Sequence, residues 1–256
     1  MGGKTFDETN IINQTEYMQI INFVKEIGLV ENLDYILPFR LGNKNSYGDI
    51  DFILSDVDKF IQIFSSKFDS DDNIRNVNKY EPIQIKRIPL FEERFNLYSK
   101  HLLTPQLFQI DLLKSWNQDS MEITRAFFSY SFANIFLKRL MSVVDRNLKF
   151  SYLGVFCSSN QFILPSGTKY IQIDEITRLI IDCEYVFRLM DLDHTRYVMG
   201  FENEFELLEY FKSSKYYSQI AKFKFNSKFK HDYSRLKPFA NLVDSKLIEV
   251  ENFIQK

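Results

Sequence analysis

The most constraining feature of the sequence is a pair of aspartates at the start of an apolar run, residues 49–54. Side chains alternate across a strand, so Asp49 and Asp51 point to one face, with Cα atoms roughly 7 Å apart. The apolar residues that follow would anchor the strand in a core. Two carboxylates held side by side repel each other, and a divalent cation between them is the simplest reason for the arrangement. Hard oxygen ligands suit Mg²⁺ or Mn²⁺, so the pattern predicts a metal-binding strand.

A third aspartate and a glycine-bearing loop extend this candidate site. Asp111 stands in a second apolar run, residues 107–113, where a buried carboxylate is costly and usually has a partner. The loop 42–48 directly precedes the first strand, and glycines and polar groups in such a loop can approach and bind phosphate oxygens. The residues expected to contact the phosphates are Gly42, Asn43, Lys44 and Ser46. Three carboxylates that hold two ions about 4 Å apart suit in-line phosphoryl or nucleotidyl transfer.

The pair of aspartates has a second interpretation when it is taken alone. Carboxylates at this spacing also occur as helix caps or as exposed loop acids. The glycine-bearing loop before the pair and the apolar strand after it favour the metal site over these alternatives.

Composition limits the class of protein. The chain has 256 residues, of which 45% are hydrophobic and 16% aromatic, so it can bury a substantial core and form one domain or two modest ones. Its net charge of -2 creates no global attraction to nucleic acid, so any basic surface must be local. Cys157 and Cys183 have no metal-ligand spacing and are expected to be buried thiols. With no signal peptide and no apolar run of about 20 residues, a cytoplasmic protein without a membrane partner is expected.

Periodicity predicts an α+β fold with two domains, residues 1–117 and 118–256. Helical spacing predicts helices over 11–28, 56–68, 122–144, 174–190, 203–213 and 239–254. Strands are predicted over 35–41, 49–54, 83–88 and 107–113, with polar loop over 69–78 and a hairpin within 152–170. The second domain is therefore expected to be mostly helical.

Taken together, these motifs resemble the DNA polymerase beta-type nucleotidyltransferase superfamily. The resemblance depends on four features in order: a predicted strand, the polar loop that begins at Gly42, the motif Asp49-Ile50-Asp51, and the later motif Gln109-Ile110-Asp111-Leu112. The chain is more specifically similar to nucleotidyltransferase-like proteins of large DNA viruses, phages and fungi. Segments 128–134, 149–154 and 189–204 resemble the C-terminal half of that group, so the resemblance covers about residues 35–215. Asn43 stands where the superfamily normally has Ser, and the spacing from Gly42 to Asp49 is shorter than in most members.

The resemblance implies a fold, a cofactor and site residues. The first domain would be a palm, a mixed sheet backed by two helices, in which Asp49, Asp51 and Asp111 bind two magnesium ions and carry catalysis. A helical second domain would hold the nucleotide base. Asn134 and Lys138 would then face the nucleotide, although a solvated polar stripe on a packed helix explains them as well. Tyr152 could stack on a base or simply belong to the core.

A basic, aromatic segment near the C-terminus is a candidate nucleic-acid contact. Cations alternate with phenylalanines there, and phosphate contacts combined with stacking rings suit single-stranded nucleic acid. An amphipathic edge strand protected by lysines is the alternative. The lysines proposed for this patch are Lys222, Lys224, Lys228 and Lys230.

These observations predict a magnesium-dependent nucleotidyltransferase. It would move a nucleoside monophosphate from an NTP such as ATP to a hydroxyl acceptor, for which a nucleic-acid 3′ end is favoured. The alternatives are nucleotidylation of a protein or small molecule, or a catalytically inactive nucleotidyltransferase-like binding module. If the protein is viral, the host cytoplasm is its expected location.

Overall fold

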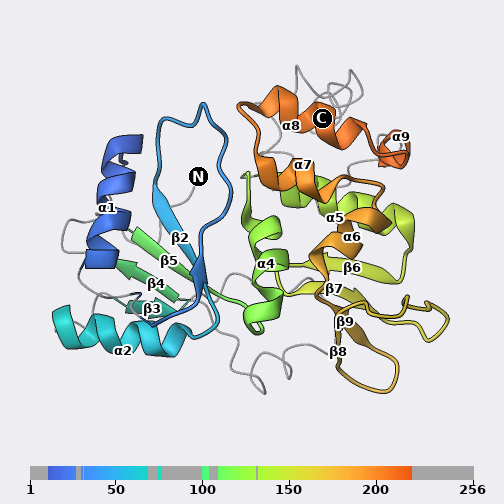
Figure 1. The fold of residues 1–256 in the computed structure, drawn as a ribbon, viewed down its shortest axis with the longest axis horizontal. Coiled ribbons are helices and arrows are strands. Elements are labelled where there is room, and N and C mark those ends of the chain that lie inside the picture. Colours follow the sequence, from blue (N-terminus) through green and yellow to red (C-terminus); the bar gives the residue numbers. More distant parts are fainter. Residues whose placement is uncertain are drawn as a thin grey trace, which may run out of the picture. The chain divides into compact units, whose positions relative to one another are not determined.

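The structure is a computed structural model that describes residues 11–26, 30, 32–68, 74–76, 100–103, 109–130 and 132–220. Over these residues the chain has an α+β fold (Figure 1), as predicted, and it divides into two compact units. The first unit comprises residues 1–38 and 44–125, and the second comprises residues 39–43 and 126–256. The sequence predicts a domain boundary after residue 117. In the structure the chain leaves the first unit for the second after residue 125, inside helix α4 (Met121–Phe128).

The first unit is built on a mixed five-stranded sheet with the order β1-β2-β5-β4-β3. Its two central strands, β2 (Asp49–Leu54) and β5 (Gln109–Lys114), are parallel, and the other neighbouring pairs are antiparallel. The outer strands are β1 (Tyr35–Ile36), β4 (Lys100–Leu103) and β3 (Ile74–Asn76). Two helices accompany this sheet, α1 (Gln14–Glu26) and α2 (Val57–Phe68).

Alternation along the central strands separates an apolar face from a polar one. Ile50, Phe52 and Leu54 of β2 join one hydrophobic cluster with Ile110 and Leu112 of β5. The same cluster contains residues of both helices, so α1 and α2 pack on this face. Because successive side chains of a strand point to opposite faces, the intervening aspartates point away from the helices.

The second unit contains a four-stranded antiparallel sheet and several helices. Its strand order is β6-β7-β9-β8. Gly154 begins β7 with a φ of +139°, and a Cβ there would collide with the carbonyl oxygen of Ile180, so the position requires glycine. The strands are β6 (Leu148–Ser151), β7 (Gly154–Cys157), β8 (Tyr170–Gln172) and β9 (Arg178–Ile180). The helices are α5 (Ala133–Val144), α6 (Cys183–Leu189), α7 (His194–Met199), α8 (Glu204–Lys212) and α9 (Tyr217–Ile220).

The long helix predicted over 122–144 is broken in two. Helix α4 ends at Phe128, and α5 begins at Ala133. Between them Tyr130 has a φ of +54°, a left-handed conformation that no continuous helix permits. Its amide donates to the carbonyl of Phe39 at 3.0 Å, so a contact distant in sequence replaces the helical hydrogen bond.

Other elements also differ from the sequence prediction. The hairpin is β6–β7, which turns at Tyr152 and Leu153, rather than a hairpin within 152–170. The predicted helix 174–190 is wrong in its first half, because β9 occupies residues 178–180 and α6 starts only at Cys183. Strand β3 lies in a segment expected to be polar loop, and β1 is shorter than predicted.

Several predictions agree with the structure or lie beyond its description. Strand β2 has the predicted bounds, α2 starts one residue later than predicted, and α8 is one residue shorter than predicted at each end. The predicted strand 83–88 and helix 239–254 lie outside the described residues. Within the described part of the chain, no helix has the length and apolar character needed to cross a membrane.

Candidate metal centre

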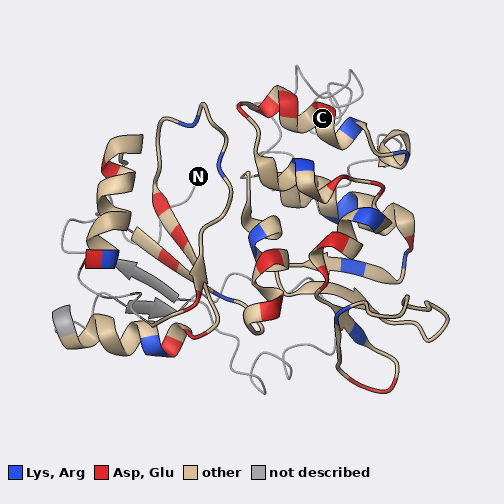
Figure 2. Cartoon of the chain, in the orientation of Figure 1, with Lys and Arg blue, Asp and Glu red and all other residues tan. Residues whose placement is uncertain are grey.

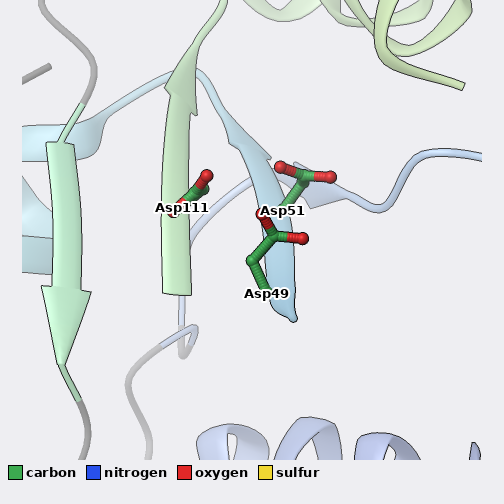
Figure 3. A group of neighbouring side chains, drawn as sticks. All are labelled: Asp49, Asp51 and Asp111. Atoms are coloured by element: carbon green, nitrogen blue, oxygen red, sulfur yellow. The ribbon is translucent and has the colours of Figure 1, made fainter. Parts of the chain in front are cut away.

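The structure brings Asp49, Asp51 and Asp111 together on one face of the first unit's sheet (Figure 3). One carboxylate oxygen from each residue lies within 4.8 Å of the others. Asp49 and Asp51 are partly buried, whereas Asp111 is only 3% exposed. Three oxygen donors at this separation suit a hard divalent cation such as Mg²⁺.

Strand register explains why these three residues meet. In the parallel β2–β5 pair, Asp51 lies directly opposite Asp111, and Asp49 lies opposite Gln109. Neighbouring strands are about 4.8 Å apart, so the four residues form a two-by-two array whose side chains share a face. On the opposite face of the sheet, Ile50 and Ile110 pack in the hydrophobic cluster. A shift of register by one residue would expose them, so this packing fixes the pairing of the two strands.

The fourth member of the array, Gln109, binds the most buried aspartate. Its Nε2 donates a hydrogen bond to Oδ1 of Asp111 at 2.6 Å. Gln109 is 1% exposed, so this contact takes place in the interior of the unit. From the sequence, Gln109 is expected only as part of the motif that precedes Asp111. Its position two residues before Asp111 in a strand, on the same face, is the signal that could have identified it.

The two central strands carry a concentration of negative charge (Figure 2). Asp and Glu positions lie within both β2 and β5 in that view. The cation of β5, Lys114, lies at its C-terminal end, and its Nζ is 3.7 Å from a carboxylate oxygen of Asp58 on α2. The side chains of these strands thus bring three carboxylates and no cation to the shared face, an arrangement that favours a bound cation.

Tyr47 anchors the segment that leads into β2. Its amide and carbonyl exchange hydrogen bonds with Ile12 at 2.8 and 2.9 Å, and its ring centroid lies 4.2 Å from that of Tyr17. Lys44 is close to this anchor, with Nζ 4.9 Å from the centroid of the Tyr47 ring. Ser46 is exposed. Lys44 and Ser46 therefore belong to the same unit as the three aspartates, on a segment held by a buried tyrosine.

Gly42 and Asn43 have a different setting from the one expected. Both belong to the second unit. The Gly42 amide donates to the Phe201 carbonyl at 3.0 Å, and the Asn43 amide donates to the Glu202 carbonyl at 2.8 Å. The space beside the Gly42 Cα is taken by the Glu202 carboxylate. These two amides thus take part in contacts within the chain, while the Asn43 side chain is exposed.

Two further predicted nucleotide-binding residues, Asn134 and Lys138, lie on α5 of the second unit. Asn134 is 9% exposed, and among the described residues its Oδ1 has no hydrogen-bond partner. Lys138 stands one turn further along, with Nζ 4.8 Å from the centroid of the Phe127 ring. Tyr152 is buried against the rings of Phe127 and Phe128, so it packs as a core aromatic residue in this structure.

The remaining predictions concern the lysine patch and the cysteines. Lys222, Lys224, Lys228 and Lys230 lie outside the described residues. Cys157 and Cys183 are both buried, as expected from the sequence.

Comparison with known proteins adds no family. No protein-family model matches the chain, and no curated protein matches it either. The chemistry proposed below therefore depends on the geometry of the chain's own residues.

Proposed function

We propose that the protein is a magnesium-dependent nucleotidyltransferase. The observation that carries the proposal is the group of three carboxylates, Asp49, Asp51 and Asp111, held within 4.8 Å on two neighbouring parallel strands. The donors are hard oxygen atoms on rigid elements, and they fit Mg²⁺ or Mn²⁺. A mixed sheet with helices packed on its opposite face supports the same proposal, because it agrees with the palm that the sequence resembles.

The three aspartates would have different roles in binding the ions and in accepting the proton. Asp49 and Asp51 would hold both ions, and Asp111 would complete the site nearest the acceptor and accept the proton of its hydroxyl. Bound magnesium would supply charge neutralisation for the triphosphate and activation of the acceptor hydroxyl. In the balanced reaction the acceptor oxygen bonds to the α-phosphorus, the bond from that phosphorus to the bridging oxygen breaks, and pyrophosphate leaves.

Side chains, rather than backbone amides, are the proposed triphosphate contacts. The amides of Gly42 and Asn43 already donate within the chain, so they are poor candidates for binding phosphate. The side chains of Lys44 and Ser46 lie in the unit that holds the aspartates. The exposed side-chain carboxamide of Asn43 can add a further hydrogen-bond donor. Under this proposal Lys44 contributes charge and Ser46 contributes a hydroxyl donor.

Asn134 is the residue that best supports a nucleotide contact in the second unit. Burying an amide oxygen with no hydrogen-bond partner is costly, and a donor group on a bound base would remove that cost. Lys138 lies one turn further along the same helix and would add a positive charge near a phosphorylated ligand. Both residues therefore remain proposed nucleotide contacts.

The proposed acceptor is a nucleic-acid 3′ end, which is suggested by the lysines at 222–230. A protein side chain or a small molecule is the alternative acceptor. A binding module without catalysis is a further alternative, and one observation favours it, namely that the Gly42 and Asn43 amides are engaged inside the chain.

The test is transfer of label from each NTP to a mixed RNA and DNA oligonucleotide pool in the presence of Mg²⁺. The wild-type protein should label an oligonucleotide and release pyrophosphate, whereas Asp51→Asn and the Asp49→Asn/Asp51→Asn double variant should not. Metal-dependent NTP binding without oligonucleotide labelling would direct the search to protein or small-molecule acceptors. Wild-type activity in Asp51→Asn, or the absence of any metal-dependent NTP binding, would refute the proposal.

A further inference from the structure

Gln109 is a buried polar residue at a position where the strand would accept an apolar one. On the same face of the two strands, Ile53 and Leu113 are fully or almost fully buried apolar residues. Burial of a long amide side chain costs conformational entropy and desolvation unless its polar atoms are bonded. At Gln109 the compensating contact is a hydrogen bond of 2.6 Å to Asp111, so the residue is tied to the candidate metal centre.

The chemistry of the contact fixes its direction. An ionised carboxylate can only accept hydrogen bonds, so the amide must turn its NH₂ group toward Asp111. This hydrogen bond restricts rotation of the Asp111 carboxylate about its Cβ–Cγ bond. Because Asp111 lies across from Asp51 in the register, the restricted carboxylate lies beside the other two donors rather than turning away from them.

Gln109 is uncharged, and this is as important for the metal site as the length of its side chain. A lysine or arginine at this position would also bind Asp111, but its positive charge would cancel part of the negative field that attracts the ion. A fourth carboxylate would add repulsion inside the unit and would donate nothing while ionised. An amide orients the carboxylate without changing the charge of the site.

We propose that Gln109 is a positioning residue, whose buried amide holds the carboxylate of Asp111 in the orientation in which it binds the divalent cation with Asp49 and Asp51. The inference rests on the proposed function, since it concerns the same metal centre. Partners that orient metal ligands commonly contribute about 10- to 100-fold to metal affinity or activity. The same range is expected here.

The test compares Mn²⁺ affinity and catalysis in the full-length protein. Gln109→Met keeps the length of the side chain and removes the donor, and Gln109→Asn keeps the amide but shortens its reach. Both variants should weaken Mn²⁺ binding, followed by the spin-resonance signal of free Mn²⁺, about 10- to 100-fold. The Mg²⁺ concentration for half-maximal transfer should rise in parallel, while the KM for the NTP at saturating Mg²⁺ stays unchanged.

Ser115→Ala is the matched control for loss of a buried hydrogen bond. Ser115 follows the same strand and is fully buried, and its Oγ donates to the Leu54 carbonyl at 3.1 Å. This variant should lower the melting temperature and leave Mn²⁺ affinity unchanged. A purely structural role for Gln109 would make its variants behave in the same way.

The outcomes separate this inference from the proposed function. If the wild type binds Mn²⁺ and transfers nucleotide while both Gln109 variants bind Mn²⁺ equally well, the positioning role is overturned and the proposed function stands. If both variants fail to fold, Gln109 is a structural residue and the inference is likewise overturned. If the wild type binds no Mn²⁺, the proposed function fails and the inference fails with it.

Discussion

At the scale of single residues, the candidate site depends on one pairing register. Asp51 lies opposite Asp111 because Ile50 and Ile110 are both buried against the helices on the other face. A shift of one residue would send the aspartates of β2 into that apolar cluster. The apolar core on the opposite face therefore fixes the register that brings the three carboxylates together.

Divalent metal should stabilise the wild type through these carboxylates. A ligand that binds only the folded protein raises the free energy of unfolding, by about 1.4 kcal/mol at a concentration about ten times its dissociation constant. In a thermal melt, Mg²⁺ at that level should raise the melting temperature of the first unit by a few degrees. The Asp51→Asn variant should show little or no increase.

Asp56→Asn is the control for this prediction, because it changes the same type of side chain and the same charge. Asp56 accepts from the Lys59 amide at 2.9 Å at the start of α2, and asparagine caps helices equally well. Its melting temperature should respond to Mg²⁺ as the wild type does. An equal response in Asp51→Asn would show that the ion binds elsewhere.

At the scale of elements, the segment 39–43 is held to the second unit by both of its ends. The Phe39 amide donates to Ser129 Oγ at 2.8 Å, and the amides of Gly42 and Asn43 donate to residues 201 and 202. The next residues lead to β2 in the first unit. This geometry explains why the backbone amides of Gly42 and Asn43, at the start of the predicted phosphate-binding loop 42–48, are engaged inside the chain.

Gly42→Ala tests whether the backbone at Gly42 binds phosphate or only makes contacts within the chain. The new methyl group would meet the Glu202 carboxylate, an exposed and flexible group that can rotate away, so the free energy of unfolding should fall by less than about 1 kcal/mol. The KM for the NTP should change by less than about twofold, because the proposed phosphate contacts are side chains. Steady-state kinetics and urea unfolding measure the two quantities.

Lys44→Met is the companion variant, since it keeps the aliphatic stem and removes the charge. It should raise the KM for the NTP about tenfold, which corresponds to about 1.4 kcal/mol. A large rise in KM for Gly42→Ala with unchanged stability would instead show that backbone at Gly42 approaches the triphosphate.

Elements with strong local patterns were predictable, and those fixed by distant contacts were not. The alternation in β2 and the helical spacing of α2 are local, and both elements lie where the sequence placed them. The break at Tyr130 depends on its hydrogen bond to Phe39, which no local pattern shows. The three aspartates were identified from motifs, but the role of Gln109 required the register of two strands.

Helix α7 carries a buried phenol that links folding to pH. Burial raises the pKa of Tyr197 well above its ordinary value, and its hydroxyl donates to the Ala126 carbonyl at 2.8 Å. Because the folded pKa is raised, the contribution to stability is complete below about pH 10, the ordinary tyrosine pKa, and is lost as pH rises above it. Stability of the second unit should therefore fall steeply above about pH 10.

Tyr197→Phe tests this linkage. At pH 7 the variant should lose about 1 kcal/mol with the hydrogen bond. At about pH 10.5 the deficit relative to wild type should shrink by roughly 0.8 kcal/mol, because phenylalanine has no proton to lose. Urea unfolding at both pH values measures the difference, with Tyr170→Phe on the exposed surface of β8 as the control. An equal deficit at both pH values would contradict the linkage.

At the scale of the whole molecule, charge sets how a nucleic-acid acceptor could be attracted. The net charge is -2, so the protein as a whole does not attract polyanions. The candidate metal centre is itself negative. An oligonucleotide must therefore be held by a local group of cations, and the sequence offers one at Lys222, Lys224, Lys228 and Lys230.

Replacing these four lysines by glutamine should weaken oligonucleotide binding and flatten its dependence on salt. Each phosphate contact with a single strand contributes about 0.7 to the slope of log affinity against log salt, so four lost contacts should reduce the slope by about 3. Fluorescence anisotropy of a labelled oligonucleotide over a range of NaCl concentrations measures this slope.

The control variant replaces four exposed lysines elsewhere by glutamine, namely Lys25, Lys149, Lys169 and Lys212. It makes the same change in net charge and should leave the slope within about 1 of the wild-type value. If the two quadruple variants behave alike, attraction is a property of total charge, and the 222–230 segment is not the acceptor site. If only the first variant loses slope and also loses oligonucleotide labelling, while its metal-dependent NTP binding is retained, acceptor binding and nucleotide binding are separate functions of the chain.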